Sequence, residues 1–278
     1  VSMLSRYFNR FLIPILIFSS FSCATMTVEQ EKSVSEDFEK SVKQNFSIFH
    51  DRVVRDYVET IGRKILSSFP QNSFEYEFQL IESEEINAFA GPAGKIFLNT
   101  GVLLKAKNVG EVAGVIAHEI GHVVRRHVAE NYSRKKPVAI GKNVAVIAAT
   151  ILGGGQLGRA TGMVGGIASA AYLNKFTRED EIEADAFAIQ ALVDAGYHPD
   201  GLVTFFETLL SEATTRPPEF LSSHPTTEKR IQTVKLLIAS KENLANLAYT
   251  DNGRFEIIQR RVRLRMGLES VVIGDPVY

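Results

Sequence analysis

The chain has 278 residues, of which 45% are hydrophobic and 23% are charged, proportions that are ordinary for a globular protein with a full core. Its 31 basic and 32 acidic side chains leave a net charge of −1. Nucleic-acid recognition requires a basic surplus or patch, so we expect no nucleic-acid partner. The single cysteine excludes an internal disulfide and a thiolate zinc site, and any metal must therefore be held by histidine and carboxylate.

The first 22 residues have the pattern of a secretory signal of the lipoprotein type. Arg6 and Arg10 provide a positive start, and the apolar run that follows is too short for a membrane-spanning helix. Cys23, which follows this run, stands where a bacterial lipoprotein carries its lipid, although Ser20 occupies the position where leucine is usual. We therefore predict lipidation of Cys23; the alternative is an ordinary signal peptide or short membrane anchor with an incidental cysteine.

The next part of the chain predicts a tether, helices and then a small sheet. Residues 23–37 are polar and are expected to form the tether, and one or two amphipathic helices follow from residue 38. Alternation of apolar and polar side chains predicts a half-buried strand at 74–80, with further extended segments at 86–90 and 95–98. Within the second segment, Asn87, Ala88 and Phe89 could form a sheet edge that pairs with an extended substrate, or an ordinary core strand.

A helix with the pattern H-E-x-x-H follows these strands. His118 and His122 are four residues apart, so on a helix both imidazoles lie on one face and can reach one metal ion. Glu119 is then placed to take the proton of a water activated by the metal. The helix is expected from Asn108, with Glu111 in a capping box, to about Asn131. The alternative makes both histidines ordinary core residues.

The same reasoning places His127 away from the metal. It lies five residues beyond His122 and beside Arg125 and Arg126, so we expect a solvated, basic helix end.

A third ligand is expected on a later helix that begins near Thr177, with Asp180 in its capping box, and that ends at Gly196. Glu181 and Asp185 share one face of this helix. Glu181 can bind the metal, while Asp185 can accept the N–H of a ligand histidine and fix its tautomer. The alternative is an acidic, solvated helix face.

Two segments carry no predicted catalytic role. Residues 138–173 are rich in glycine and alanine and predict two close-packed helices with a hinge at 153–155; contact with a membrane or an apolar client is the alternative. Residues 241–278 form an extension of unknown role. Within it, apolar residues alternate with the arginines of 260–265, which predicts a strand at 255–265 with a solvated basic side, although a helix is also compatible.

From residue 38 to about 237 the sequence resembles the CAAX-prenyl-protease and HtpX family of gluzincin metalloendopeptidases, particularly its soluble periplasmic lipoprotein branch. Three blocks carry the resemblance: His118-Glu119-Ile120-Gly121-His122, Thr177-Arg178 leading into Glu181-Ile182-Glu183-Ala184-Asp185, and Ser222-Ser223-His224-Pro225 with Arg230 after it. Thr177 departs from the serine that is commoner in the family.

The resemblance implies zinc on His118, His122 and Glu181, with Glu119 as the general base. It also implies that His224 lies on a loop near the metal, where it could stabilise the oxyanion or cap the zinc in a resting state. An ordinary loop histidine is the alternative for His224.

These observations predict an α+β fold: a mostly helical, zincin-type metalloprotease domain at 38–240 with a small β-sheet beside the active-site helix. The predicted function is a zinc metalloendopeptidase with one Zn²⁺ per chain that cleaves polypeptides in the bacterial periplasm, including envelope or outer-membrane proteins. A lipid would anchor it to a membrane, with the outer membrane favoured; secretion or an N-terminal membrane anchor is the alternative. Another functional class also fits: a chaperone-like envelope assembly or quality-control lipoprotein with little or gated proteolysis. A purely structural zinc site is the weakest alternative.

Overall fold

The computed structural model describes residues 26–69, 73–135, 176–213, 218–225 and 228–270. The predicted signal peptide, Cys23 and the segment 138–173 lie outside these ranges. In chain order the described elements are α1 (Val28–Asn45), α2 (Arg52–Leu66), β1 (Glu77–Ile81), β2 (Ala88–Ala90), η1 (Pro92–Gly94), β3 (Lys95–Asn99), α3 (Thr100–Lys105), α4 (Val109–Val124), α5 (His127–Lys135), α9 (Arg178–Asp194), α10 (Asp200–Glu212), α11 (Phe220–Ser223), α12 (Glu228–Ala239), η2 (Leu244–Asn246) and α13 (Arg254–Arg265). The predicted α+β, mostly helical class is confirmed. Within the described ranges, no helix has both the length and the apolar character needed to cross a membrane.

The three strands form one mixed sheet in the order β1-β3-β2. β1 runs parallel to β3 and β2 runs antiparallel to it, so that Leu80 and Ala88 both lie opposite Leu98. In this described sheet β2 is an edge strand, and the predicted strands at 74–80, 86–90 and 95–98 correspond to β1, β2 and β3 with shifted ends.

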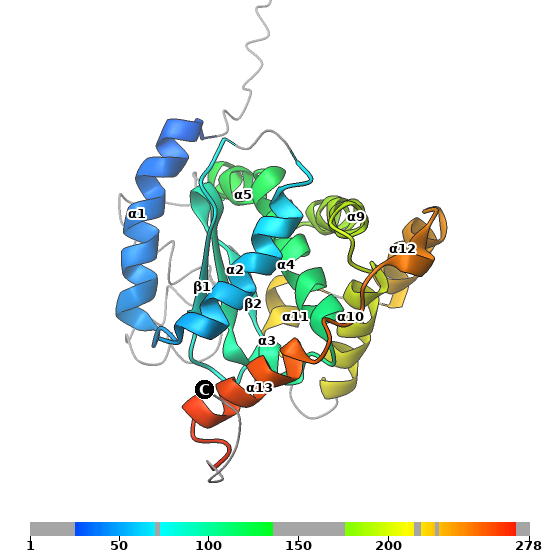
Figure 1. Cartoon of the computed structure of the whole chain (residues 1–278). Helices are drawn as coiled ribbons and strands as arrows, with labels where there is room; N and C mark the ends of the chain where they lie inside the picture. Colours follow the sequence, from blue (N-terminus) through cyan, green and yellow to red (C-terminus); the bar gives the residue numbers. More distant parts are fainter. Residues whose placement is uncertain (1–25, 70–72, 136–175, 214–217, 226–227, 271–278) are drawn as a thin grey trace, which may run out of the picture.

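Both faces of the sheet are covered. On one face, Phe89 and Phe97 pack against Phe38 and Val42 of α1. Side chains of the opposite face, including Leu98, join the larger core formed with α2 and α4. Figure 1 shows α1 on one side of the strands and α2 and α4 on the other. Because successive side chains of a strand alternate between its faces, neighbouring residues such as Phe97 and Leu98 contribute to different cores.

Helix α4 lies at the centre of the molecule. It contacts β2 and β3 of the sheet, and also packs against α9 and α10. Every residue from Val109 to Val123 is buried. A helix that is buried on all sides needs apolar or small residues around its whole circumference. The few polar side chains of α4 therefore cannot be explained as a solvated helix face.

The N-terminal part of the structure differs from the prediction. Helix α1 begins at Val28, where Thr27 and Gln30 form a capping box. The expectation of a tether is therefore wrong for residues 28–37. The error arose because the buried side of this stretch is itself polar: Glu31 and Ser35 are enclosed through hydrogen bonds to Ala93, Arg126 and Pro92, which no local apolar pattern indicates.

The predicted strand at 255–265 is also wrong, because these residues form helix α13. Phe255, Ile258 and Val262 are buried at helical spacing in the larger core. The four arginines of 260–265 are ion-paired: Arg261 and Arg265 contact the buried carboxylate of Asp51 at 2.8 and 3.0 Å, and Arg260 and Arg263 contact Glu269 at 2.9 and 2.8 Å. The described part of the C-terminal extension therefore packs as part of the same folded unit.

Candidate metal centre

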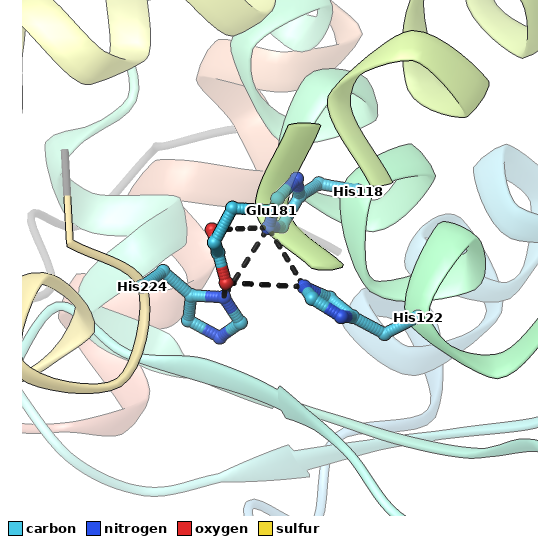
Figure 2. A group of neighbouring side chains, drawn as sticks. All are labelled: His118, His122, Glu181 and His224. Carbon is cyan, nitrogen blue, oxygen red and sulfur yellow. Dashed lines mark hydrogen bonds and ion pairs between the residues drawn. The ribbon is translucent and has the colours of Figure 1, made fainter. Parts of the chain in front are cut away.

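Three polar side chains from α4 and α9 converge with one from the loop after α11 (Figure 2). His118 and His122 project from α4, whose first turn is capped as predicted by Asn108, which accepts from the backbone N–H of Glu111 at 3.0 Å. Glu181 lies in the first turn of α9, and His224 follows the last residue of α11. Local sequence signals thus set the start of the two long helices that bring the ligands together.

The capping of α9 was also predicted correctly. Thr177 and Asp180 form a capping box, and the helix ends before Gly196, whose φ is +75°. Because this start is fixed, the first-turn position of Glu181 is fixed with it.

Gly121 allows α9 to approach α4 closely. A Cβ atom at this position would lie 3.0 Å from the carbonyl oxygen of Ala184 and 3.1 Å from its Cα. The glycine inside the H-E-x-x-H pattern therefore lets the glutamate-bearing helix lie almost in backbone contact with the histidine-bearing helix.

Each of the four residues offers one ligand atom, and these atoms all lie within 4.8 Å of one another, close enough to surround one metal ion. The Nε2 atoms of His118 and His122 are 3.1 Å apart, and each lies 3.5 Å from an oxygen of Glu181. His224 Nδ1 is 3.0 Å from Glu181 Oε1 and 3.2 Å from His118 Nε2. Zinc bonds of 2.0–2.1 Å in a tetrahedron imply separations between ligand atoms of about 3.3 Å. All four side chains are buried, and three imidazoles with one carboxylate are a donor set that suits zinc.

Asp185 and Arg230 contact residues of this cluster. His118 Nδ1 is 3.0 Å from Asp185 Oδ1, the position expected for an acceptor that fixes the tautomer of His118. Arg230 donates to both oxygens of Asp185 at 2.6 and 2.7 Å and contacts Glu181 at 2.5 Å. Asp185 thus contacts both Arg230 and His118 Nδ1, and His118 Nε2 faces the other candidate ligand atoms.

These contacts set the charges of the buried groups. Burial alone would raise the pKa of Glu181 and of Asp185, but the nearby Arg230 and histidines outweigh it, and both pKa values lie below the usual range. Burial would lower the pKa of His118, whereas its hydrogen bonds to Asp185 and Glu181 raise it to about 9. The pKa of His122 falls well below its usual value, first through burial and then through repulsion by His118. The site is therefore organised to balance positive charge against two carboxylates.

Glu119 is buried beside the four ligand atoms without being one of them. Burial raises the pKa of its carboxyl group, and attraction to His224 and His118 acts in the opposite direction. Its Oε1 lies 3.5 Å from His224 Nε2, so His224 stands between the ligand cluster and this carboxylate.

The predicted substrate-binding segment lies next to this carboxylate. Asn87 immediately precedes β2, which contains Ala88 and Phe89 and contacts α4. The backbone N–H of Ala90 is close enough to Glu119 to lower its pKa. All three predicted side chains are buried, and Asn87 Oδ1 has no hydrogen-bond partner within the described residues.

His127 is buried next to His122, and the prediction that it lies at a solvated helix end is wrong. It is 2% exposed, and its Nδ1 lies 2.9 Å from His122 Nδ1. Helix α4 ends at Val124 instead of continuing to about Asn131, because Arg126 has a φ of +59° and the chain turns before α5. The prediction treated the helix as continuous, and no Gly, Asn or Pro marks the turn.

Two further contacts were not predicted. Phe176 stacks on the His122 ring with centroids 3.8 Å apart, and Arg230 contacts two acidic residues of α9. Arg230 was noted in the sequence only as a residue following His224, and neither contact has a local signal because each joins segments distant in the chain.

Comparison with known proteins agrees with this geometry. The model of peptidase family M48 matches residues 52–238. The chain belongs to this family. It is 31% identical over 217 residues to the beta-barrel assembly-enhancing protease of Escherichia coli (strain K12), a match that covers 75% of this chain and 44% of that protein. The putative beta-barrel assembly-enhancing protease of Vibrio cholerae is 33% identical over the same shares. The mitochondrial metalloendopeptidase OMA1 of Schizosaccharomyces pombe is 28% identical, covering 73% of this chain and 61% of OMA1. The chain thus spans less than half the length of its two bacterial relatives.

Proposed function

We propose that the protein is a zinc-dependent endopeptidase that hydrolyses peptide bonds in polypeptides. The observation that carries the proposal is the buried convergence of His118, His122, Glu181 and His224, whose ligand atoms all lie within 4.8 Å of one another, with the carboxylate of Glu119 beside them. Membership in a peptidase family supports the same activity.

The side chains have distinct roles in this proposal. His118, His122 and Glu181 hold one zinc ion, which when bound supplies a Lewis acid that lowers the pKa of water and polarises a carbonyl group. Glu119 accepts a proton from the attacking water and delivers it to the leaving amine. Its raised pKa suits this double role, because a carboxylate with a pKa nearer neutrality both takes and returns a proton readily.

The edge strand would hold the substrate. β2 is at the edge of the described sheet and next to Glu119, so an extended peptide that paired with it would bring its backbone to the general base. The buried Oδ1 of Asn87 is an available acceptor for a peptide N–H.

The substrates we propose are misfolded or assembling proteins of the bacterial envelope. The two bacterial relatives are named for the enhancement of β-barrel assembly, and the sequence of residues 1–23 supports export and lipidation at Cys23. The lipid would anchor the protein to a membrane of the periplasm, with the outer membrane favoured over secretion or an N-terminal membrane anchor.

The decisive test compares the parent protein with Glu119→Gln for zinc content and for casein cleavage. Because the substitution is isosteric and Glu119 is not among the proposed ligands, we expect one zinc per chain in both proteins and cleavage only by the parent. Cleavage by the variant would contradict the role of Glu119, and absence of zinc from the parent would contradict the ligand assignment.

One observation favours a gated enzyme, which is the second candidate. His224 Nδ1 is spaced as a fourth ligand atom, so it fills the position that a catalytic zinc site leaves open. In this resting form the protein would bind clients and cleave them rarely. If His224 caps the site, His224→Ala raises the basal rate of casein cleavage; if His224 instead stabilises the oxyanion, the same variant loses activity. If the Glu119→Gln protein restores the function that is lost in a strain without the parent protein, the chaperone-like function is established.

A further inference from the structure

We infer that His127 is a positioning residue that orients His122 and determines which of its ring nitrogens faces the metal centre. The inference rests on the zinc site proposed above. It gives His122 the kind of support that Asp185 gives His118.

The contact between the two rings carries the inference. His122 Nδ1 and His127 Nδ1 are 2.9 Å apart, and both side chains are buried. A hydrogen bond at this distance needs one nitrogen with a proton and one without. Because His122 Nε2 faces the other ligand atoms and must offer its lone pair there, the proton belongs on His122 Nδ1. His127 Nδ1 is then the acceptor, which leaves the proton of a neutral His127 on its Nε2.

The surroundings of His127 match that tautomer. Its Nε2 lies 3.6 Å from Glu183 Oε2 and 4.0 Å from Asp180 Oδ1. These carboxylates are near the start of α9, where Asp180 is held in place by the capping box. Two carboxylates facing Nε2 favour an N–H at that nitrogen electrostatically. A polar path therefore runs from the start of α9 through His127 to His122.

The chain is bent to make this contact possible. On a continuous helix, five residues turn the side chain about 140° away, so His127 would point away from the cluster. The turn at Arg126 removes that constraint. The Arg126 guanidinium donates to the buried Glu31 of α1 at 2.9 and 3.1 Å, which holds a backbone conformation that arginine rarely adopts. The ion pair with α1 thus helps to place His127 against His122.

The test measures zinc affinity of the 278-residue chain by competition with a chromogenic chelator, for the parent, His127→Leu and His127→Asn. Leucine cannot accept a hydrogen bond, and loss of such an outer contact lowers metal affinity about 10- to 100-fold. Asparagine should restore most of the affinity, because its Oδ1 stands at the position of histidine Nδ1 and can accept from His122. His50→Leu, which removes an exposed histidine, is the matched control and should bind zinc as the parent does.

Two further readouts separate positioning from simple packing. In the cobalt-substituted protein, His127→Leu should change the visible absorption spectrum, whereas a core defect would lower the melting temperature of the metal-free chain without changing that spectrum. Equal zinc affinity in the parent and His127→Leu overturns the inference, as does a His127→Asn protein that binds as weakly as the leucine variant. If His127→Leu does not fold, His127→Asn is compared with His127→Gln, whose amide lies one bond further out. Tighter binding by the asparagine variant supports the inference and equal binding overturns it. A parent that binds no zinc contradicts the proposed function itself.

Discussion

Replacement of Arg230 by methionine should destabilise the protein strongly, although Arg230 is not a proposed ligand. The guanidinium makes hydrogen bonds of 2.6 and 2.7 Å to Asp185, contacts Glu181 at 2.5 Å and is 7% exposed. Methionine keeps much of the apolar stem, but it removes the guanidinium that lies 4.6 Å above the Phe206 ring and leaves two buried carboxylates without their cation. Breaking a buried ion pair in this way costs about 3–5 kcal/mol. At roughly 2–4 °C per kcal/mol for a chain of this size, the melting temperature should fall by about 6–20 °C.

Urea unfolding of chelator-treated protein is the appropriate assay, because zinc would supply positive charge to the same carboxylates. Adding zinc should therefore recover part of the loss. The effect should also depend on pH. The pKa values of Glu181 and Asp185 are lowered in the folded state, so their pairing with Arg230 stabilises the protein above the usual carboxyl pKa. That stabilisation is lost as the pH falls through the folded pKa values, where the deficit of the variant should shrink.

Arg52→Met is the matched control for this experiment. The side chain of Arg52 is 86% exposed and pairs with Asp56 at 3.3 Å, so its loss should change the free energy of unfolding by no more than about 0.5 kcal/mol. If Arg230→Met lies within about 1 kcal/mol of the Arg52→Met protein at neutral pH, the reasoning about buried charge compensation is refuted.

Three other predictions follow from the same site. First, because the pKa of His118 is raised to about 9, zinc binding at pH 7 should release the proton of His118, and the zinc affinity should rise toward pH 9. Calorimetry in buffers of different ionisation enthalpy measures the proton release. A zinc affinity that is constant from pH 7 to 9 would contradict the prediction. Second, Gly121→Ala should lower the free energy of unfolding by about 1–3 kcal/mol and weaken zinc binding, since its methyl group displaces Ala184 on α9. If urea unfolding and zinc affinity are both unchanged, α9 can move away from the methyl group at no cost and the prediction is contradicted. Third, Glu31→Gln should speed amide hydrogen exchange around Ala93 and Arg126, because one carboxylate accepts from the Ala93 N–H at 3.2 Å and from the Arg126 guanidinium; exchange mass spectrometry reports it, and equal protection in both proteins would refute the coupling.

Local patterns in the sequence were sufficient for much of the site. The i, i+4 spacing of His118 and His122 and of Glu181 and Asp185 predicts which side chains share a helix face, because helix geometry is the same in every protein. The capping residues at Asn108 and Thr177 correctly predicted where both helices begin. The metal, catalytic and supporting roles of these residues remain predictions that the experiments above test.

Spacing within one helix carries no information about segments that meet only in the folded chain. The helical form of residues 28–37 depends on the sheet that α1 covers, and that of 255–265 depends on the core beside α2 and α3. In both stretches the local pattern was compatible with more than one backbone conformation, and contacts with distant segments of the chain selected the helix.

By itself, the sequence determined the family, the mostly helical α+β class and the candidate ligands on α4 and α9, because these depend on motifs and on regular helix periodicity. Only the tertiary structure shows that Arg230 pairs with two buried carboxylates and that His224 lies beside the other candidate ligands. It also shows that His127 is buried against His122 rather than facing solvent. The physical reason is the same in each case: these contacts join separate elements, and the turn at Arg126 depends on a glutamate distant in the chain.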